Sequence, residues 1–235
     1  MEFICKKEGI VTLVPVPGGK FEGARDVDCL MALYEPLCYD TICEFLPDGA
    51  RAAEIGSFEG GSACILWNGM RRRGKRVSLA CHDTFEPFEV DGVTRDIEKM
   101  FDANTASWKT RGIKVKGDSK TTYDVHPDGS LDYVFVDGDH SYDGALADIL
   151  GFMPKLREDG WMFIQDSTDG VRQAVEDAIG DSRLKIVVEP PCGHYVTVIG
   201  PDARLREYAK RLADEVVRVD DLGPGPTDRM SFGIA

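Results

Sequence analysis

The chain has 235 residues, 43% of them hydrophobic, which is enough to bury the core of one sizeable domain. Its formal net charge of −13, from 41 acidic and 28 basic residues, argues against a nucleic acid or an anionic membrane as partner, because a phosphate-binding surface needs a dense basic face. No stretch approaches the roughly 20 apolar residues of a membrane span, and the N-terminus lacks the apolar region of a signal peptide. We therefore expect a soluble, cytoplasmic protein, and the sequence leaves a homo-oligomer open.

The cysteines and the one basic cluster are both interpreted structurally. The seven cysteines are an odd number without a C-x-x-C pair, and most lie in apolar segments, which indicates a reducing compartment. The basic cluster at 71–76 follows a predicted helix, and we interpret it as favourable charge at a helix C-terminus.

The first 46 residues are expected to form strands and a helix that pack on the core. Residues 2–5 and 10–16 are β-like, and apolar residues recur at helical spacing from 26 to 45. Pro36 is expected to kink or divide this helix, because proline lacks the N–H that a helix interior uses.

Residues 47–219 alternate strand with helix, and we predict one domain there. The helix at 141–153 is expected to bury Leu146, Ile149, Leu150 and Met153. Alternation of this kind predicts an α/β fold with a Rossmann-like, doubly wound, mostly parallel sheet covered by helices on both faces. The predicted strands are 50–55, 77–81, 113–115, 131–136 and 161–164, and the predicted helices are 62–72, 94–108, 141–153 and 170–180.

The end of the chain departs from this alternation. The apolar runs 184–188 and 195–199 are separated by a link too short for a parallel crossover, so they should pair as an antiparallel hairpin. A helix is expected from 202 to 217. Residues 220–235, rich in Gly and Pro, are expected to form a mobile tail.

The first predicted strand of the domain runs into a glycine-rich loop that could hold a ligand at a helix N-terminus. Its G-x-x-x-G spacing is neither a dinucleotide fingerprint nor a P-loop. An acid before the first glycine suits a cofactor with an ammonium or sulfonium group, which favours S-adenosylmethionine; tight strand-to-helix packing is the equally weighted alternative. The candidate cofactor-binding residues are Glu54, Gly56, Ser57, Gly60, Gly61 and Ser62.

Polar residues also follow the second and third strands. Asp83 is placed to accept hydrogen bonds from a ribose diol, although a surface aspartate would leave the same pattern. Asp118 and Ser119 could recognise an adenine amino group, or could cap the helix that follows.

The fourth strand ends in Asp137-Gly-Asp-His140, the most specific segment of the chain. His140 could act as a general base, since an imidazole pKa of about 6.5 suits proton transfer at neutral pH. Asp139 and His140 could instead cap the following helix, together with Ser141.

The fifth strand ends in Gln165 and Asp166, so Asp137 and Asp166 should project from neighbouring strands. Two carboxylates with the amide oxygen of Gln165 would form an oxygen-rich site for a divalent cation such as Mg²⁺.

In this order, Glu54-x-Gly56, Asp83, Gly117-Asp-Ser119, the segment 132–144 and the Gln-Asp end of 159–166 resemble class I S-adenosylmethionine-dependent methyltransferases. The resemblance covers about residues 50–200. More narrowly, the sequence resembles the branch that contains macrocin-type and mycinamicin-type sugar O-methyltransferases of natural-product pathways.

The resemblance implies roles for the candidate residues. Glu54 and the glycine loop would hold the methionine part of the cofactor, Asp83 the ribose, and Asp118 with Ser119 the adenine. Asp137 would bind at the cofactor site and, with Asp166, the metal; His140, or in some members Asp139, would be the base. Gln165 departs from the family, which often has a second acid there.

The predicted function is methyl transfer from S-adenosylmethionine to a hydroxyl of a sugar, glycosylated metabolite or polyol. One alternative is a metal-independent N- or C-methyltransferase with the same fold. Another is a relative that binds the cofactor without transferring its methyl group. The acceptor is expected to contact the 84–93 loop, the link at 189–194 and both termini, because loops carry specificity on such scaffolds.

Overall fold

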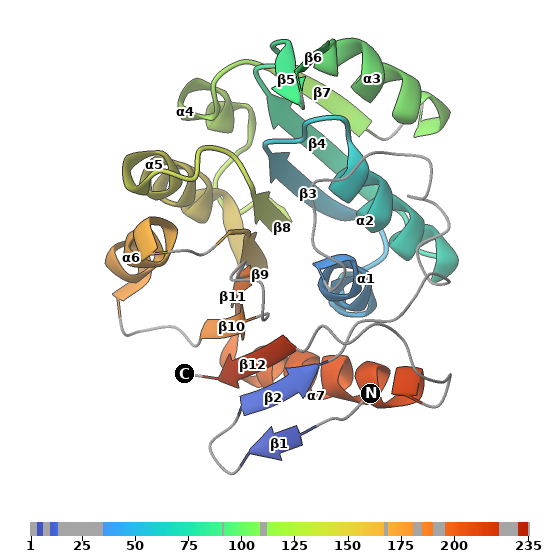
Figure 1. The fold of residues 1–235 in the computed structure, drawn as a ribbon, viewed down its shortest axis with the longest axis vertical. Coiled ribbons are helices and arrows are strands. Elements are labelled where there is room, and N and C mark those ends of the chain that lie inside the picture. Colours follow the sequence, from blue (N-terminus) through green and yellow to red (C-terminus); the bar gives the residue numbers. More distant parts are fainter. Residues whose placement is uncertain are drawn as a thin grey trace.

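The computed structural model describes residues 4–6, 10–13, 35–90, 92–108, 112–166, 169–180, 185–189, 196–220 and 230–234. Strands and helices alternate through the middle of the chain, and the helices lie on both faces of a central sheet (Figure 1). The strands are β1 (Ile4–Lys6), β2 (Ile10–Leu13), β3 (Ala50–Ile55), β4 (Val77–Asp83), β5 (Phe88–Val90), β6 (Val93–Arg95), β7 (Gly112–Lys116), β8 (Leu131–Val136), β9 (Leu156–Ile164), β10 (Lys185–Glu189), β11 (Val196–Ile199) and β12 (Met230–Ile234). The α-helices are α1 (Glu35–Phe45), α2 (Gly61–Arg72), α3 (Ile97–Asn104), α4 (Ser119–Thr122), α5 (Tyr142–Phe152), α6 (Asp169–Ile179) and α7 (Asp202–Asp220), with short 3₁₀ turns at Ala106–Trp108, Tyr123–Val125 and Met153–Lys155.

The main sheet has ten strands in the order β1-β2-β12-β10-β11-β9-β8-β3-β4-β7. The strands from β9 to β7 pair in parallel, as the sequence predicts. β11 runs antiparallel to both β9 and β10, which confirms the predicted hairpin. Because the strand order reverses between β3 and β8, the chain leaves their carboxyl ends toward opposite faces of the sheet, which forms the crevice that α/β folds use for ligands.

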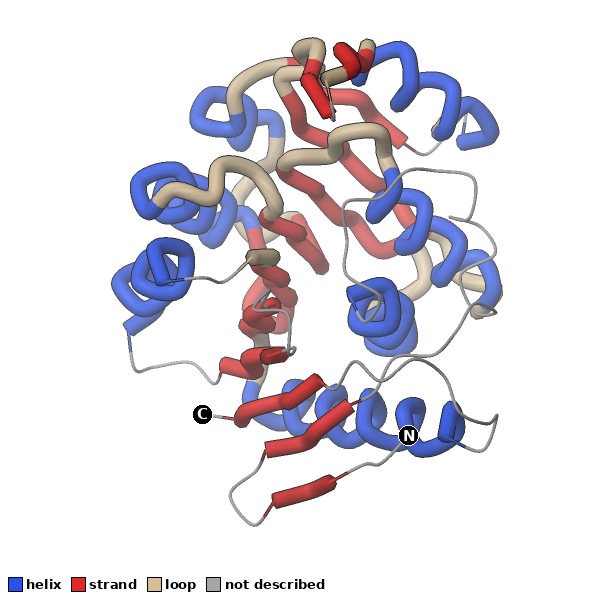
Figure 2. The backbone as a smooth tube through the Cα atoms, viewed as in Figure 1, coloured by secondary structure: helices blue, strands red, loops and turns tan. Residues whose placement is uncertain are grey.

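Two apolar clusters hold the sheet between its helices. One face packs against α1, α2 and α7, with Tyr39 and Trp161 fully buried at its centre. The other face packs against α5 and α6. The tube trace shows the same arrangement, with α4, α5 and α6 on one side of the sheet and α1 and α2 on the other (Figure 2). This confirms a doubly wound fold with helices on both faces.

Several predicted elements have different bounds in the structure. The described helix α1 spans Glu35–Phe45, and the predicted kink at Pro36 involves residues before Glu35 that lie outside the described part of the chain. The predicted helix at 94–108 begins later, because Val93–Arg95 pairs with β5 in a separate hairpin. Residues 26–34 and the link 190–195 lie outside the described residues.

The predicted buried stripe of α5 is confirmed at Ile149 and in part at Leu146 and Met153, which pack partly buried against the core, and is wrong at Leu150. Leu150 is 50% exposed, whereas Ala145, Asp148, Ile149 and Phe152 are buried. The helix therefore directs the Asp148 carboxylate toward the sheet edge. Apolar periodicity alone does not predict an acid at a buried position.

The expected tail at 220–235 contains a strand. β12 pairs antiparallel with β2 and β10, so the two ends of the chain join the same sheet (Figure 1). Among the described residues, no helix has the length and apolar character needed to cross a membrane.

The basic cluster connects two helices, α1 and α2. Arg73 of the α2 end binds Asp40 at 2.9 Å and Glu44 at 3.2 Å, both on α1. Lys75 donates to the carbonyls of Cys43, Glu44 and Leu46 at the end of α1. The positive charge of this cluster therefore lies at the C-terminus of α2, as predicted, and also at the C-terminus of α1.

Candidate functional site

The candidate site is a cleft at the carboxyl ends of β3, β4, β7, β8 and β9. It consists of two cavities of about 380 and 540 Å³, which share Gly56, Asp83, Thr84 and Gly138. We call them the first and the second cavity. Because their walls are shared, one elongated ligand can extend through both.

The structure distributes the predicted residues unevenly between these cavities. Glu54 and Gly60 line neither of them. The first cavity is lined by Gly56, Asp83, Asp118, Ser119 and Asp139, and the second by Gly56, Ser57, Gly61, Ser62, Asp83, Asp137, His140, Gln165 and Asp166.

The glycine loop lies directly against the end of β8. Gly56 has a φ of +78°, and a Cβ atom there would lie 1.9 Å from the carbonyl oxygen of Asp137. A side chain would therefore separate the two strand ends. Glycine at this position is required by close approach of the backbone.

Glu54 is buried beneath the loop, 2% exposed, and its carboxyl accepts a hydrogen bond from the Ser62 hydroxyl. Burial raises the pKa of Glu54 to about 8, and the nearby Asp137 and Asp83 carboxylates add to this. The carboxyl is therefore mainly protonated at pH 7. A cationic group brought to Ser62 would favour its ionisation.

Asp83 organises the wall that both cavities share. Its carboxylate accepts the backbone N–H of Phe58 at 2.8 Å and that of Phe85 at 2.7 Å. Phe58 and Phe85 have φ values of 47° and 52°, which are unusual for aromatic residues. One side chain thus holds the glycine loop and the β4 end in their bent conformations.

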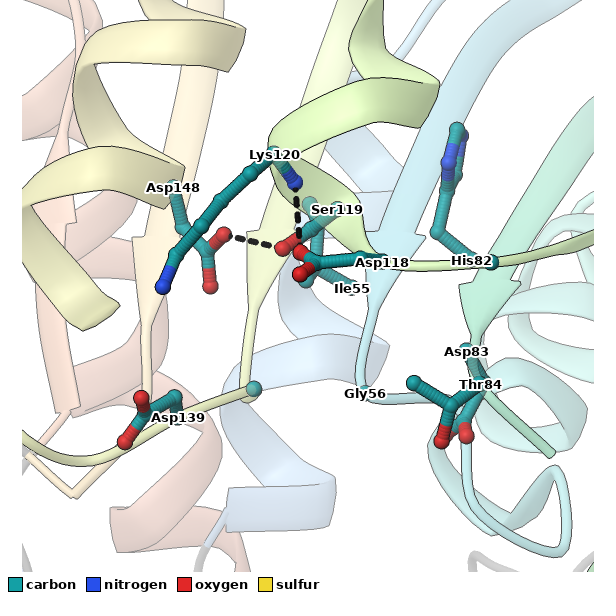
Figure 3. Close-up of a pocket in the computed structure, with 12 residues that line it drawn as sticks. Ile55, Gly56, His82, Asp83, Thr84, Asp118, Ser119, Lys120, Asp139 and Asp148 are labelled. Carbon is teal, nitrogen blue, oxygen red and sulfur yellow. Dashed lines mark hydrogen bonds between the residues drawn. The ribbon is translucent and has the colours of Figure 1, made fainter. Parts of the chain in front are cut away.

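Asp118 and Ser119 begin α4 at the edge of the first cavity (Figure 3). Asp118 caps the helix by accepting the Lys120 N–H at 2.9 Å, so the capping interpretation is correct and the carboxylate still lines the cavity. The Ser119 hydroxyl donates to Asp148 at 2.5 Å. Asp148 is 3% exposed, and burial raises its pKa to about 6.

Asp137, His140 and Asp166 converge in the second cavity. The imidazole Nε2 of His140 lies 3.1 Å from Asp137 Oδ1, and its Nδ1 lies 3.3 Å from Asp166 Oδ2. One potential ligand atom from each residue lies within 4.8 Å of the others. The predicted convergence of the two strand-end carboxylates is therefore present, with the histidine between them.

The pKa values of His140 and Asp137 are both raised in this cluster. The hydrogen bond to Asp137 raises the pKa of His140, while burial raises the pKa of Asp137 to about 6. Asp166 has a φ of 48°, a strained conformation of the kind that clusters at functional sites.

Asp139 lies on the other side of this turn. Its carboxylate accepts the N–H of Ser141 at 2.9 Å, and Ser141 caps α5 by accepting from Gly144. Asp139 lines the first cavity, whereas His140 lines the second. The two candidate bases therefore face different parts of the cleft.

Sequence reasoning missed three contributors to the site. Asp148 could have been identified from the sequence, because it is an acid within an apolar helical stripe. Phe58 and Phe88 form an edge-to-face pair, with ring centroids 5.7 Å apart, and both line the second cavity. Their pairing depends on the β5–β6 hairpin, and the Asp-Gly pair at 91–92, between Val90 and Val93, is the sequence signal that could have predicted it.

Comparison with known proteins agrees with this geometry. Residues 53–167 match the profile of a family described as a methyltransferase domain. No curated protein matches the chain with significance.

Solved structures share the fold at low sequence identity. The S-adenosylhomocysteine-bound methyltransferase PaMTH1 of Podospora anserina is 13% identical, with a TM-score of 0.54 over 78% of this chain and 86% of its own. Cofactor-bound Rv0187 from MTB is 16% identical, with a TM-score of 0.54 over 77% and 86%. An rRNA methylase of Streptococcus thermophilus is 9% identical, with a TM-score of 0.55 over 73% and 98%.

The chain has the fold of class I S-adenosylmethionine-dependent methyltransferases. Together, the fold and the matched domain support an S-adenosylmethionine-dependent methyltransferase.

Proposed function

We propose that the protein transfers the methyl group of S-adenosylmethionine to a hydroxyl of a small molecule, with His140 as the general base. The observation that carries this proposal is the imidazole between two carboxylates in the second cavity. A hydroxyl must lose its proton during methylation, and a positioned base supplies about 10²- to 10⁴-fold of the rate.

The roles of the three residues follow from their distances. Asp137 accepts the proton of His140 Nε2 and so orients the ring, which leaves Nδ1 to receive the hydroxyl proton. Asp166, near Nδ1, stabilises the imidazolium that forms. The acceptor oxygen forms a bond to the methyl carbon while the carbon–sulfur bond breaks, and its electron pair leaves on sulfur as S-adenosylhomocysteine.

The donor set of this cluster also fits a divalent cation. Asp137 and Asp166 would hold it, with Gln165 as a further oxygen donor of the same cavity. When bound, such a cation supplies positive charge that lowers the pKa of a hydroxyl beside it. Carboxylates favour Mg²⁺ and Mn²⁺, and the nearby imidazole favours Mn²⁺ of these two.

We further propose a sugar, a glycosylated metabolite or a polyol as the acceptor. Phe88, 51% exposed, and Pro87 give the second cavity apolar surface in addition to its carboxylates. A sugar has an apolar C–H face and several hydroxyls, so it can contact both kinds of surface.

Methyl-labelled S-adenosylmethionine tests this function directly. Purified protein would be incubated with panels of glycosides, polyols and amines, in EDTA and with Mg²⁺ or Mn²⁺ restored. We expect labelled ethers from hydroxyl acceptors, with a rate that EDTA abolishes and Mn²⁺ restores. Label entering only amines, unaffected by EDTA, would favour a metal-independent N-methyltransferase and overturn the proposal.

A further inference from the structure

We infer that Asp148 determines which nucleobase the cofactor site accepts, by fixing the Ser119 hydroxyl as a hydrogen-bond acceptor toward the first cavity. Asp148 is thus a positioning residue that acts through Ser119. This inference deepens the proposed function and rests on the cofactor's occupying both cavities.

The first step is the polarity of the Ser119 hydroxyl. A serine hydroxyl has one hydrogen to donate and two lone pairs. In the structure that hydrogen goes to Asp148 Oδ1, 2.5 Å away, as the dashed line between the two side chains shows (Figure 3). An ionised carboxylate accepts only, so it keeps this direction of donation. Ser119 therefore offers only lone pairs to a ligand.

The second step is the rigidity of Asp148. Its side chain is buried on α5, and a Cβ atom on Gly138 would lie 2.8 Å from its Oδ2. The turn after β8 thus leaves space for this carboxylate only because residue 138 is glycine. Neither partner can turn away easily, since Ser119 is held in the first turn of α4.

The third step is the orientation of the cofactor. The two cavities share a wall, and the proposed base and both strand-end carboxylates lie in the second. The reacting sulfonium must lie beside them, so the nucleoside end extends into the first cavity toward Ser119. There an adenine can donate from its exocyclic amino group, whereas the carbonyl of hypoxanthine would meet the lone pairs of Ser119.

The inference can be tested with S-adenosylhomocysteine and its inosine analogue. Calorimetry would give the ratio of their dissociation constants for wild type, Asp148→Leu, Ser119→Ala and Asp143→Asn. Leucine keeps the branched shape and removes both acceptors, which frees the Ser119 hydrogen. Asp143, exposed on the first turn of the same helix, is the matched control.

We expect wild type and Asp143→Asn to prefer the adenine ligand, and that preference to fall about tenfold in Asp148→Leu and Ser119→Ala, the effect of one hydrogen bond to a ligand. A preference unchanged in Asp148→Leu would overturn the inference, whatever Ser119→Ala does, while leaving cofactor binding established. If Asp148→Leu does not fold, Asp148→Asn gives the same test, because its amide can donate to Ser119 and so release the serine hydrogen. Wild type that binds neither ligand would overturn the proposed function itself.

Discussion

Glu54 is a carboxyl whose charge is suppressed by its surroundings. Burial raises its pKa to about 8 from an ordinary value of 4.5. Between these two values the folded protein binds a proton that the unfolded chain lacks, so the contribution of Glu54 to stability falls as the pH rises from 4.5 through about 8. At alkaline pH the free protein therefore keeps a buried charge that a cofactor ammonium group could neutralise.

Substituting Glu54 with Gln should separate stability from binding. At pH 8.5 we expect the melting temperature to rise by about 2–4 °C for each kcal/mol gained, since the buried charge is removed. Affinity for S-adenosylhomocysteine should fall about tenfold or more, because an ammonium group at Ser62 loses the negative charge of the carboxylate behind that serine. Scanning calorimetry and titration at the same pH provide both values. A variant less stable than wild type at pH 8.5 would refute the assigned protonation.

His140 and Asp139 compete for the role of base, and the structure places them in different cavities. With an acceptor identified, His140→Gln should lower kcat by about 10²- to 10⁴-fold without weakening S-adenosylhomocysteine binding. Asp139→Asn should retain most of the activity, since its carboxylate serves the turn before α5. The opposite ranking of the two variants would transfer the role to Asp139.

At the scale of elements, Asp83 connects two bent segments. Asp83→Ala removes the acceptor of two backbone N–H groups, at Phe58 and Phe85. We expect the free energy of unfolding to fall by about 2 kcal/mol, with weaker S-adenosylhomocysteine binding, because the glycine loop loses its support. Urea denaturation and calorimetry would measure these two effects.

Asp132 provides the control for this experiment. It lies at the opposite end of the sheet and also accepts a backbone N–H, from Arg51 at 2.9 Å. Asp132→Ala should lower stability without changing cofactor affinity. Equal losses of affinity in the two variants would show that the effect of Asp83 is global instead of local.

Element prediction succeeded where apolar runs alternate with helical periodicity, from β3 to α6. Within α5 it was wrong at Leu150, which faces solvent, whereas the acid Asp148 occupies a buried position. It also missed the β5–β6 hairpin, whose exposed residues, such as Val93, carry no burial pattern.

At the scale of the molecule, an ionic network joins α1, α2 and α7. Asp40 binds both Arg72 and Arg73, while Glu44 binds Arg73 and Arg211. These arginine contacts hold the pKa of Asp40 below its usual value of 3.8, although burial opposes them. Its contribution to stability is therefore complete above pH 3.8 and is lost as the pH falls through the lower pKa of the folded state.

Asp40→Asn should lower the free energy of unfolding by about 3 kcal/mol at pH 7. The positive charge of the partly buried Arg73 would then have Glu44 but no longer Asp40 to balance it. Asp48→Asn, which breaks an exposed pair with Arg76, should remain close to wild type. Urea denaturation at pH 7 and near pH 3 checks both. A penalty of equal size at the two pH values would argue against an ionic origin.

Long-range assembly explains what the sequence could not predict. Parallel order follows from local alternation, but β12 joins β2 and β10 across the whole length of the chain. The same holds for the site: each strand-end residue was identified from its own segment. By contrast, the placement of Asp148 against Ser119, and of His140 between two carboxylates, depends on turns whose geometry no local pattern contains.

A crystal structure of the protein with S-adenosylhomocysteine tests the central claim most directly, because it places both ends of the cofactor relative to the proposed base. We predict that the adenine lies in the first cavity, with its amino group at Ser119, and that the sulfur lies in the second cavity, facing His140. A ligand bound in the reverse direction, or outside the cleft that Gly56 and Asp83 line, would contradict the account.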